Sequence, residues 1–261
     1  GPADAARRER RRRDLEAIDH RVRELVLGDA RTGAAVDGAV RAVNEDSGAL
    51  DGLLSVQNYR LAHWRAGGEE VDYRRFFDID TLAALRTEDE RVFRAVHERV
   101  LEWLQAGELD GVRVDHPDGL RRPGEYFRRL RTEAPNAWIV AEKILAPEER
   151  LPDWPVAGTT GYDFLADVTR VFLSPLGEAP LTRLWKEVSG DPRDFPEVVH
   201  EARREAAGDV LGADLNRLAN VFVHLCENRS RYRDFTRREL REALLEVAAC
   251  FPVYRTYVGE E

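Results

Sequence analysis

Apolar residues recur at helical spacing along most of this chain. Four of them between positions 15 and 25 predict a helix that follows the basic run at 7–13 and ends at Gly28. Residues 29–52 predict short helices joined by turns, and residues 201–226 predict a longer apolar helical region. We therefore expect helices to dominate the fold.

Strand signals are fewer, and two of them flank a helix. Thr87–Glu90 has the pattern of a capping box, which predicts the start of a helix that ends at Gly107. Residues 110–115 and 137–141 then predict two strands, with a helix beginning near Pro123 between them. This order predicts a parallel βαβ unit.

Three further predictions concern the C-terminal third. Thr236 is expected to cap a helix that reaches about Cys250. Residues 251–258 predict a final strand. The isolated histidines His20, His97, His200 and His224 are expected to be surface or core residues, not ligands.

Acidic residues follow both strands of the predicted βαβ unit. Asp115 ends the first strand and Glu142 follows the second, so parallel pairing would place both at one edge of the sheet. Two carboxyl groups at that range could serve as the nucleophile and the acid/base of a retaining glycosidase. By strand alternation Arg113 shares a face with Asp115 and would keep it ionised, whereas the apolar end of the second strand would favour a protonated Glu142.

Two other interpretations of these acids stay open at this point. An acid after a strand is often a turn former or a helix cap. Asp115, His116 and Asp118 also offer oxygen and nitrogen donors for a metal, although no further His or Cys is spaced to complete the site.

Aromatic residues, arginines and aspartates are dense in 57–65 and 71–80. Aromatic faces can stack on sugar rings, while Arg and Asp can bind hydroxyl groups; an ordinary packed loop would have the same composition.

Composition narrows the class of protein. The chain has 261 residues, of which 43% are hydrophobic and 34% charged, with a net charge of −9, which argues against nucleic-acid binding. No apolar run is long enough for a membrane span. The two cysteines, Cys226 and Cys250, lie in apolar stretches of helical pattern and are predicted to be reduced core residues of a cytoplasmic protein. The absence of methionine and the Gly-Pro start suggest a piece of a longer protein, the start having the form of a protease-cleavage scar.

The residues around the two acids resemble the α-amylase superfamily. Gly111–His116 is similar to its strand-four motif, in which an Arg precedes the nucleophilic Asp by two residues, and Val140–Lys143 is similar to its strand-five motif with the acid/base. Across the chain from about residue 10, further segments resemble the maltooligosyl trehalose synthase family: 59–65, 72–80, 115–119, 142–147, 158–164 and 250–257. His63 departs from the aromatic residue expected there.

The resemblance implies an intramolecular transglucosylase. Such an enzyme converts the reducing-end α-1,4 bond of a maltooligosaccharide into an α,α-1,1 bond, with Asp115 as nucleophile and Glu142 as acid/base, and it needs no metal or organic cofactor. Segments 72–80 and 158–164 are the candidate walls of the acceptor pocket. The candidate substrate contacts are Arg113, His116, Lys143, Tyr73, Arg74, Arg75, Tyr162 and Asp163.

The resemblance also implies the fold class: α/β, as a partial TIM (β/α)8 barrel with large helical insertions. We expect a helical insertion at 1–56, a barrel segment at 57–165, a helical region at 166–250 and a terminal strand segment at 251–261.

The superfamily's third carboxylate, in a His-Asp motif after strand seven, and its Asn-His motif of strand three are absent from this sequence. The remainder of a parent barrel is therefore an expected partner, and this chain alone is expected to be inactive. Two alternatives are another α-glucan hydrolase or transferase of the superfamily, and a non-catalytic helical carbohydrate-binding or interaction module.

Overall fold

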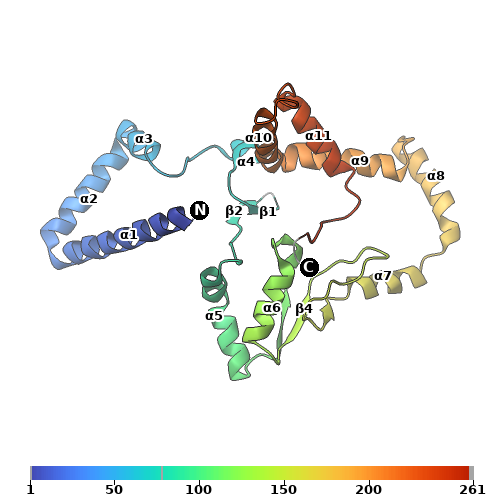
Figure 1. The fold of residues 1–261 in the computed structure, drawn as a ribbon, viewed down its shortest axis with the longest axis horizontal. Helices are drawn as coiled ribbons and strands as arrows, with labels where there is room; N and C mark the ends of the chain where they lie inside the picture. Colours follow the sequence, from blue (N-terminus) through green and yellow to red (C-terminus); the bar gives the residue numbers. More distant parts are fainter. Residues whose placement is uncertain (1, 78, 259–261) are drawn as a thin grey trace. The chain divides into compact units, whose positions relative to one another are not determined.

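A computed structural model describes residues 2–77 and 79–258 (Figure 1). The chain divides into two compact units, residues 1–63 and 64–261. Helices dominate both units, as the periodicity predicted. No helix in the described part of the chain is both long enough and apolar enough to cross a bilayer.

The first unit consists of three consecutive helices. They are α1 (Pro2–Gly28), α2 (Ala30–Glu45) and α3 (Ser47–Ser55). Asp29 and Asp46 cap α2 and α3 by accepting backbone N–H groups, which accounts for the short breaks between the helices. Arg12, in the basic run, is exposed and pairs with Glu9 and Glu16 on its own helix, so the run forms part of a solvated helix face.

The second unit contains a parallel βαβ unit at its centre. The helix α5 (Glu90–Ala106) leads to β3 (Gly111–Val114), α6 (Pro123–Glu133) and β4 (Trp138–Ala141). Strands β3 and β4 pair in parallel, and β5 (Gly158–Thr159) joins β4 to complete the order β3-β4-β5. The predicted βαβ unit is confirmed.

One face of this sheet is covered and the other is open. Ile139 and Ala141 are fully buried, and they pack with Phe93 of α5 and with Phe127 and Leu130 of α6. The alternate residues of the strands point to the face that these helices do not cover. A parallel sheet covered by helices on one face has the construction of an α/β barrel wall.

The start of α5 differs from the sequence prediction. Helix α5 is capped by Asp89 and not by Thr87, whose hydroxyl is buried and makes no hydrogen bond, so the predicted capping box is wrong. The end of α5 is as predicted, because Gly107 adopts the left-handed conformation at φ 73°.

A short hairpin precedes α5. It comprises β1 (Arg75–Phe76) and β2 (Ile79–Ala83), which pair antiparallel, and it follows the short helical turns η1 (Trp64–Ala66) and α4 (Gly67–Glu70). No strand had been predicted here.

The remaining elements are helical. They are η2 (Pro117–Gly119), α7 (Tyr162–Val171), η3 (Pro175–Gly177), α8 (Glu178–Ser189), α9 (Phe195–Glu205), the π-helical turn η4 (Ala206–Val210), α10 (Gly212–Glu227) and α11 (Arg237–Ala249). Thr236 and Glu239 form the predicted capping box of α11.

The predicted final strand is wrong. Residues 251–258 form bends and irregular backbone, and residues 259–261 lie outside the described part of the chain. The segment is held through side chains: Arg255 donates to the backbone oxygens of Asp118 and Leu120, and the hydroxyl of Tyr257 donates to Asp118. Alternating apolar residues here therefore mark contacts with the turn after β3, not a place in a sheet.

Candidate active site

The two predicted acids follow equivalent positions at the carboxyl-terminal ends of the paired strands β3 and β4. Val114 pairs with Ala141, so Asp115 and Glu142 each follow the last paired residue of their strands. The N–H of Glu142 donates to the carbonyl of Val114 at 2.9 Å, which extends the pairing by one residue. Both acids thus leave the sheet at one edge, as the βαβ pattern predicted. In α/β barrels this edge carries the active site.

Arg113 connects the two acids. Its Nη1 lies 2.6 Å from Oδ1 of Asp115, and its Nη2 lies 3.1 Å from Oε1 of Glu142. The hydrogen bond to Asp115 raises the pKa of Arg113 above its ordinary value. The predicted shared face of Arg113 and Asp115 is confirmed, and Glu142 lies within reach of the same guanidinium.

Glu142 is more enclosed and more polar in its surroundings than its apolar strand suggested. Its side chain is 20% exposed, against 60% for Asp115. Besides the contact with Arg113, its Oε2 accepts the backbone N–H of His116 at 2.8 Å. The backbone of His116 has φ 43°, in the left-handed region that histidine enters more readily than most residues. The turn after β3 therefore reaches over to fix the carboxylate after β4.

Aromatic residues surround the imidazole of His116. The ring of Phe77 stacks on it with centroids 5.8 Å apart, and Phe76 meets it edge-on at 5.7 Å. Nε2 of His116 lies 3.3 Å from the hydroxyl of Tyr254. The sequence pointed to segment 72–80 as a wall, but it did not single out these three aromatic residues. The signal for Phe76 and Phe77 was the aromatic density of segment 71–80, whereas Tyr254 lies in segment 250–257, which carried only the family resemblance.

An open cleft lies on the uncovered face of the sheet. Its volume is about 610 Å³, and it is lined by Arg113, Val140, residues 159–162 and Leu165. Tyr162, a predicted contact, lines this cleft. Asp163 lies in the first turn of α7 and accepts a hydrogen bond from the hydroxyl of Thr159 at 2.6 Å, which lowers the pKa of Asp163. Segment 158–164 thus forms a wall of the cleft that Arg113 also lines.

The side chains of Lys143 and Arg75 are buried in ion pairs within the fold. The Lys143 side chain is 1% exposed and pairs with Asp118 at 3.3 Å and Glu149 at 2.7 Å. Arg75 is buried, pairs with Asp80 and donates to the backbone oxygen of Val210. Both cations hold parts of the fold together. The sequence predicted that they contact the substrate directly, and their burial argues against such a contact.

Tyr73 and Arg74 belong to the segment that carries the hairpin. The hydroxyl of Tyr73 donates to the backbone oxygen of Asp80 at 2.5 Å, and the backbone oxygen of Arg74 accepts from Ala84 at 2.7 Å. These hydrogen bonds shape the segment. Contacts of Tyr73 and Arg74 with a substrate stay a prediction.

The metal alternative at the turn after β3 is not favoured by the geometry. Both oxygens of the Asp118 carboxylate have partners: one accepts the hydroxyl of Tyr257 at 2.5 Å, and the other pairs with the buried Lys143 at 3.3 Å. The carboxylate is therefore engaged in contacts within the fold.

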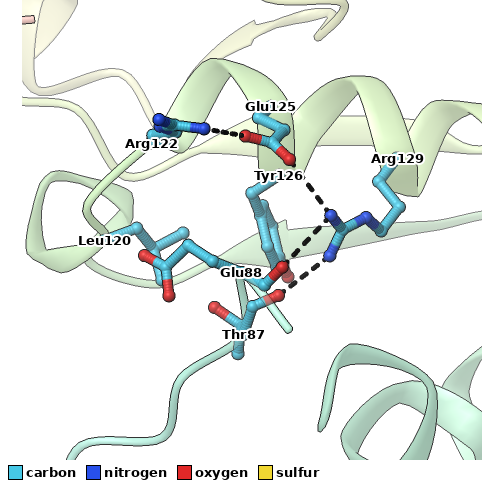
Figure 2. Close-up of a pocket in the computed structure, with 7 residues that line it drawn as sticks. All are labelled: Thr87, Glu88, Leu120, Arg122, Glu125, Tyr126 and Arg129. Atoms are coloured by element: carbon cyan, nitrogen blue, oxygen red, sulfur yellow. Dashed lines mark hydrogen bonds and ion pairs between the residues drawn. The ribbon is translucent and has the colours of Figure 1, made fainter. Parts of the chain in front are cut away.

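A second, smaller cavity lies between α6 and the segment before α5 (Figure 2). Figure 2 shows the guanidinium of Arg129 reaching the backbone oxygens of Thr87 and Glu88 and the carboxylate of Glu125. The volume of about 10 Å³ suits one water molecule and excludes a sugar ring. This cavity is a structural junction, and the open cleft is the better substrate site.

Comparison with known proteins bears on the same residues. A protein of Mycobacterium tuberculosis (strain CDC 1551 / Oshkosh) that is provisionally named maltooligosyl trehalose synthase is 48% identical over 164 residues, which cover 62% of this chain and 21% of that protein. The structure of maltooligosyltrehalose synthase from Arthrobacter ramosus is 44% identical with a TM-score of 0.70, over 78% of this chain and 26% of that one.

A Sulfolobus tokodaii protein, titled a hypothetical maltooligosyl trehalose synthase, is 34% identical with a TM-score of 0.66, over 81% of this chain and 26% of that one. No family model matches the chain. The chain spans about a fifth of the length of the curated relatives and about a quarter of the solved structures.

Proposed function

Because this chain corresponds in sequence and fold to one segment of the maltooligosyl trehalose synthases, we propose that it supplies the nucleophile and the acid/base of such an enzyme. The reaction would convert the reducing-end α-1,4 bond of a maltooligosaccharide into an α,α-1,1 bond. The observation that carries the proposal is the single guanidinium of Arg113 in contact with both Asp115 and Glu142. Glycosidases use two carboxyl groups that flank the scissile bond, and contact of both with one guanidinium supports the short separation that a retaining mechanism needs.

The chemistry follows from the different surroundings of the two acids. Glu142, the more enclosed one, protonates the oxygen of the scissile glycosidic bond, and Asp115 attacks the anomeric carbon to form a glycosyl-enzyme. The released glucose stays in the site, turns, and attacks through its anomeric hydroxyl while Glu142 takes up the proton. The bond to Asp115 breaks, and the configuration is retained.

Positioning is the role of the groups around the acids. Arg113 orients Asp115 and offsets its charge, and the backbone N–H of His116 fixes one oxygen of Glu142. Phe77 and Phe76 keep the His116 ring in place from the hairpin side. The cleft lined by Tyr162 leads to Arg113 and would accept the sugar chain. Water exclusion around the released glucose separates this reaction from hydrolysis.

Partner and location belong to the same proposal. The remainder of the barrel would supply the third carboxylate, and the product would serve trehalose biosynthesis. Both cysteines are free and one of them, Cys250, is exposed, which supports a reducing compartment such as the cytoplasm.

The test uses the enzyme encoded by the complete reading frame that contains these residues. Incubation with maltopentaose should remove reducing ends without releasing glucose, and NMR should show an α,α-1,1 linkage. Asp115→Asn and Glu142→Gln should each lower the rate by at least a thousandfold, whereas Asp167→Asn, an exposed acid on α7 paired only with Arg170, should leave it unchanged.

Three results would contradict the proposal. Full activity in either rim variant would remove the assigned roles of the acids. Release of glucose and shorter maltodextrins would assign the chain to a hydrolase or another transferase, and absence of turnover would favour the carbohydrate-binding module. The 261-residue chain assayed alone is expected to show no turnover.

A further inference from the structure

Three side chains with metal-binding atoms converge between two helices of the second unit. His200 comes from α9, and Glu246 comes from α11; Cys250 follows at the C-terminal cap of α11, four residues after Glu246. One ligand atom from each lies within 4.8 Å of the others. Residues four apart on a helix share a face, so α11 presents the carboxylate and the thiol together.

The geometry centres on one carboxylate oxygen. Nε2 of His200 lies 2.7 Å from Oε1 of Glu246, and Sγ of Cys250 lies 3.3 Å from the same oxygen. Tetrahedral zinc with ordinary bond lengths needs separations of about 3.4 Å between nitrogen and oxygen and about 3.6 Å between sulfur and oxygen. The two separations from Oε1 therefore need to grow by about 0.3–0.7 Å, and the nitrogen and sulfur, which lie within 4.8 Å, need to stand about 3.6 Å apart; side-chain rotation supplies shifts of this size.

The second oxygen of the carboxylate is held separately. Oε2 of Glu246 pairs with Arg204 of α9, which also contacts Glu242 of α11 at 3.3 Å. This leaves Oε1 facing the imidazole and the thiol. The hydrogen bond with His200 lowers the pKa of Glu246, and the hydrogen bond from the thiol of Cys250 lowers it by a smaller amount. An outer partner that orients a ligand in this way is typical of metal centres.

From these contacts we propose that His200, Glu246 and Cys250 bind a borderline-soft divalent cation, for which Zn²⁺ is the best match. Nitrogen, oxygen and thiolate sulfur are the ligand types of zinc, and three protein ligands leave a fourth position for water. The ion ties α9 to α11, far along the sequence from the acids after β3 and β4. The sequence predicted His200 to be a surface or core residue because it lies in a helical stretch. Its partner Glu246 lies 46 residues away, so no local pattern joins the two.

The experiment uses the untagged 261-residue chain, stripped with a chelator and titrated with Zn²⁺ in competition with a chromogenic chelator. One equivalent should bind. Co²⁺ should replace it and give the near-ultraviolet charge-transfer band that a cobalt–thiolate bond produces. Cys250→Ser and His200→Ala should each weaken Zn²⁺ binding at least tenfold, and Cys250→Ser should remove the cobalt–thiolate band.

The chain offers matched controls. Cys226→Ser changes the other cysteine, which is buried on α10. His224→Ala changes an exposed histidine whose ring contacts Asn228. Both variants should bind Zn²⁺ as the unmodified chain does. Glu246→Gln keeps the side-chain shape and should also weaken Zn²⁺ binding. It therefore tests the site even if a truncated variant misfolds. The site is disproved if no Zn²⁺ binds, if all variants bind equally, or if Co²⁺ gives no thiolate band. In each case the cluster is only a hydrogen-bonded contact between helices.

Discussion

Lys143 allows the sharpest test of how the turn after β3 is held in place. Its ammonium is buried and paired with Asp118, whose side chain is 6% exposed, and with Glu149, which is 32% exposed. Lys143→Met keeps an unbranched side chain that is one atom shorter, and it removes the charge. Asp118 would then be a buried carboxylate without its cation.

The expected cost follows from that burial. Breaking a buried ion pair from one side costs about 3–5 kcal/mol. The hydroxyl of Tyr257 still donates to Asp118, and Glu149 can turn to solvent, so we expect a loss near the lower end, about 3 kcal/mol. For a unit of this size that lowers the melting temperature by about 6–12 °C.

The measurement is thermal and urea unfolding followed by circular dichroism. Lys186→Met on α8 is the matched control, because that partly exposed lysine donates a hydrogen bond to the carbonyl of Pro192 and its loss should cost less than about 1 kcal/mol. The double variant Lys143→Met with Asp118→Asn should recover part of the stability, since no unpaired charge remains. If Lys143→Met unfolds at the same midpoint as Lys186→Met, or if the double variant loses the full sum of the single losses, the buried pair does not hold the turn.

Two further predictions concern the strand pairing and α11. Gly111→Ala would place a methyl group 2.1 Å from the carbonyl oxygen of Trp138 on the adjacent strand, so it should destabilise the fold by about 1–3 kcal/mol in thermal unfolding. The control Gly38→Ala on α2 meets open space and should be neutral or stabilising. Equal melting temperatures of the two variants would contradict the close approach of the strands at Gly111. Thr236→Ala removes the N-cap of α11 and should cost about 1 kcal/mol in urea unfolding at neutral pH. The hydrogen bonds from Thr236 lower the pKa of Glu239 below its ordinary value of 4.5. The stability that Glu239 contributes is therefore present above pH 4.5 and is lost as the pH falls through the folded-state pKa. If the difference in unfolding free energy between the variant and the unmodified chain does not shrink in acid, this assignment is refuted.

Local sequence patterns were sufficient for the centre of the candidate active site. Alternation along 110–115 and 137–141, with one crossover helix between them, predicted parallel pairing and a common edge for Asp115 and Glu142. The prediction succeeded because strand period and crossover length are local properties. The shared face of Arg113 and Asp115 followed from the same alternation.

Local patterns failed where a residue's role depends on distant partners. Nothing near Lys143 in the sequence shows that Tyr257 and Asp118 enclose it, and residues 251–258 were taken for a strand because side-chain docking also produces alternation. Likewise, the aromatic contacts of His116 join the hairpin and the C-terminal segment to the turn after β3.

The sequence by itself therefore determined most helices, the βαβ unit and the two acids after β3 and β4, since each depends on local spacing. It also carried the family resemblance, which rests on short motifs in a fixed order along the chain. Tertiary structure alone decided which charges are buried, as for Lys143 and Arg75, and which distant donors meet, as for His200 with Glu246. Burial and convergence are set by packing between elements far apart in the chain, and no local periodicity records them.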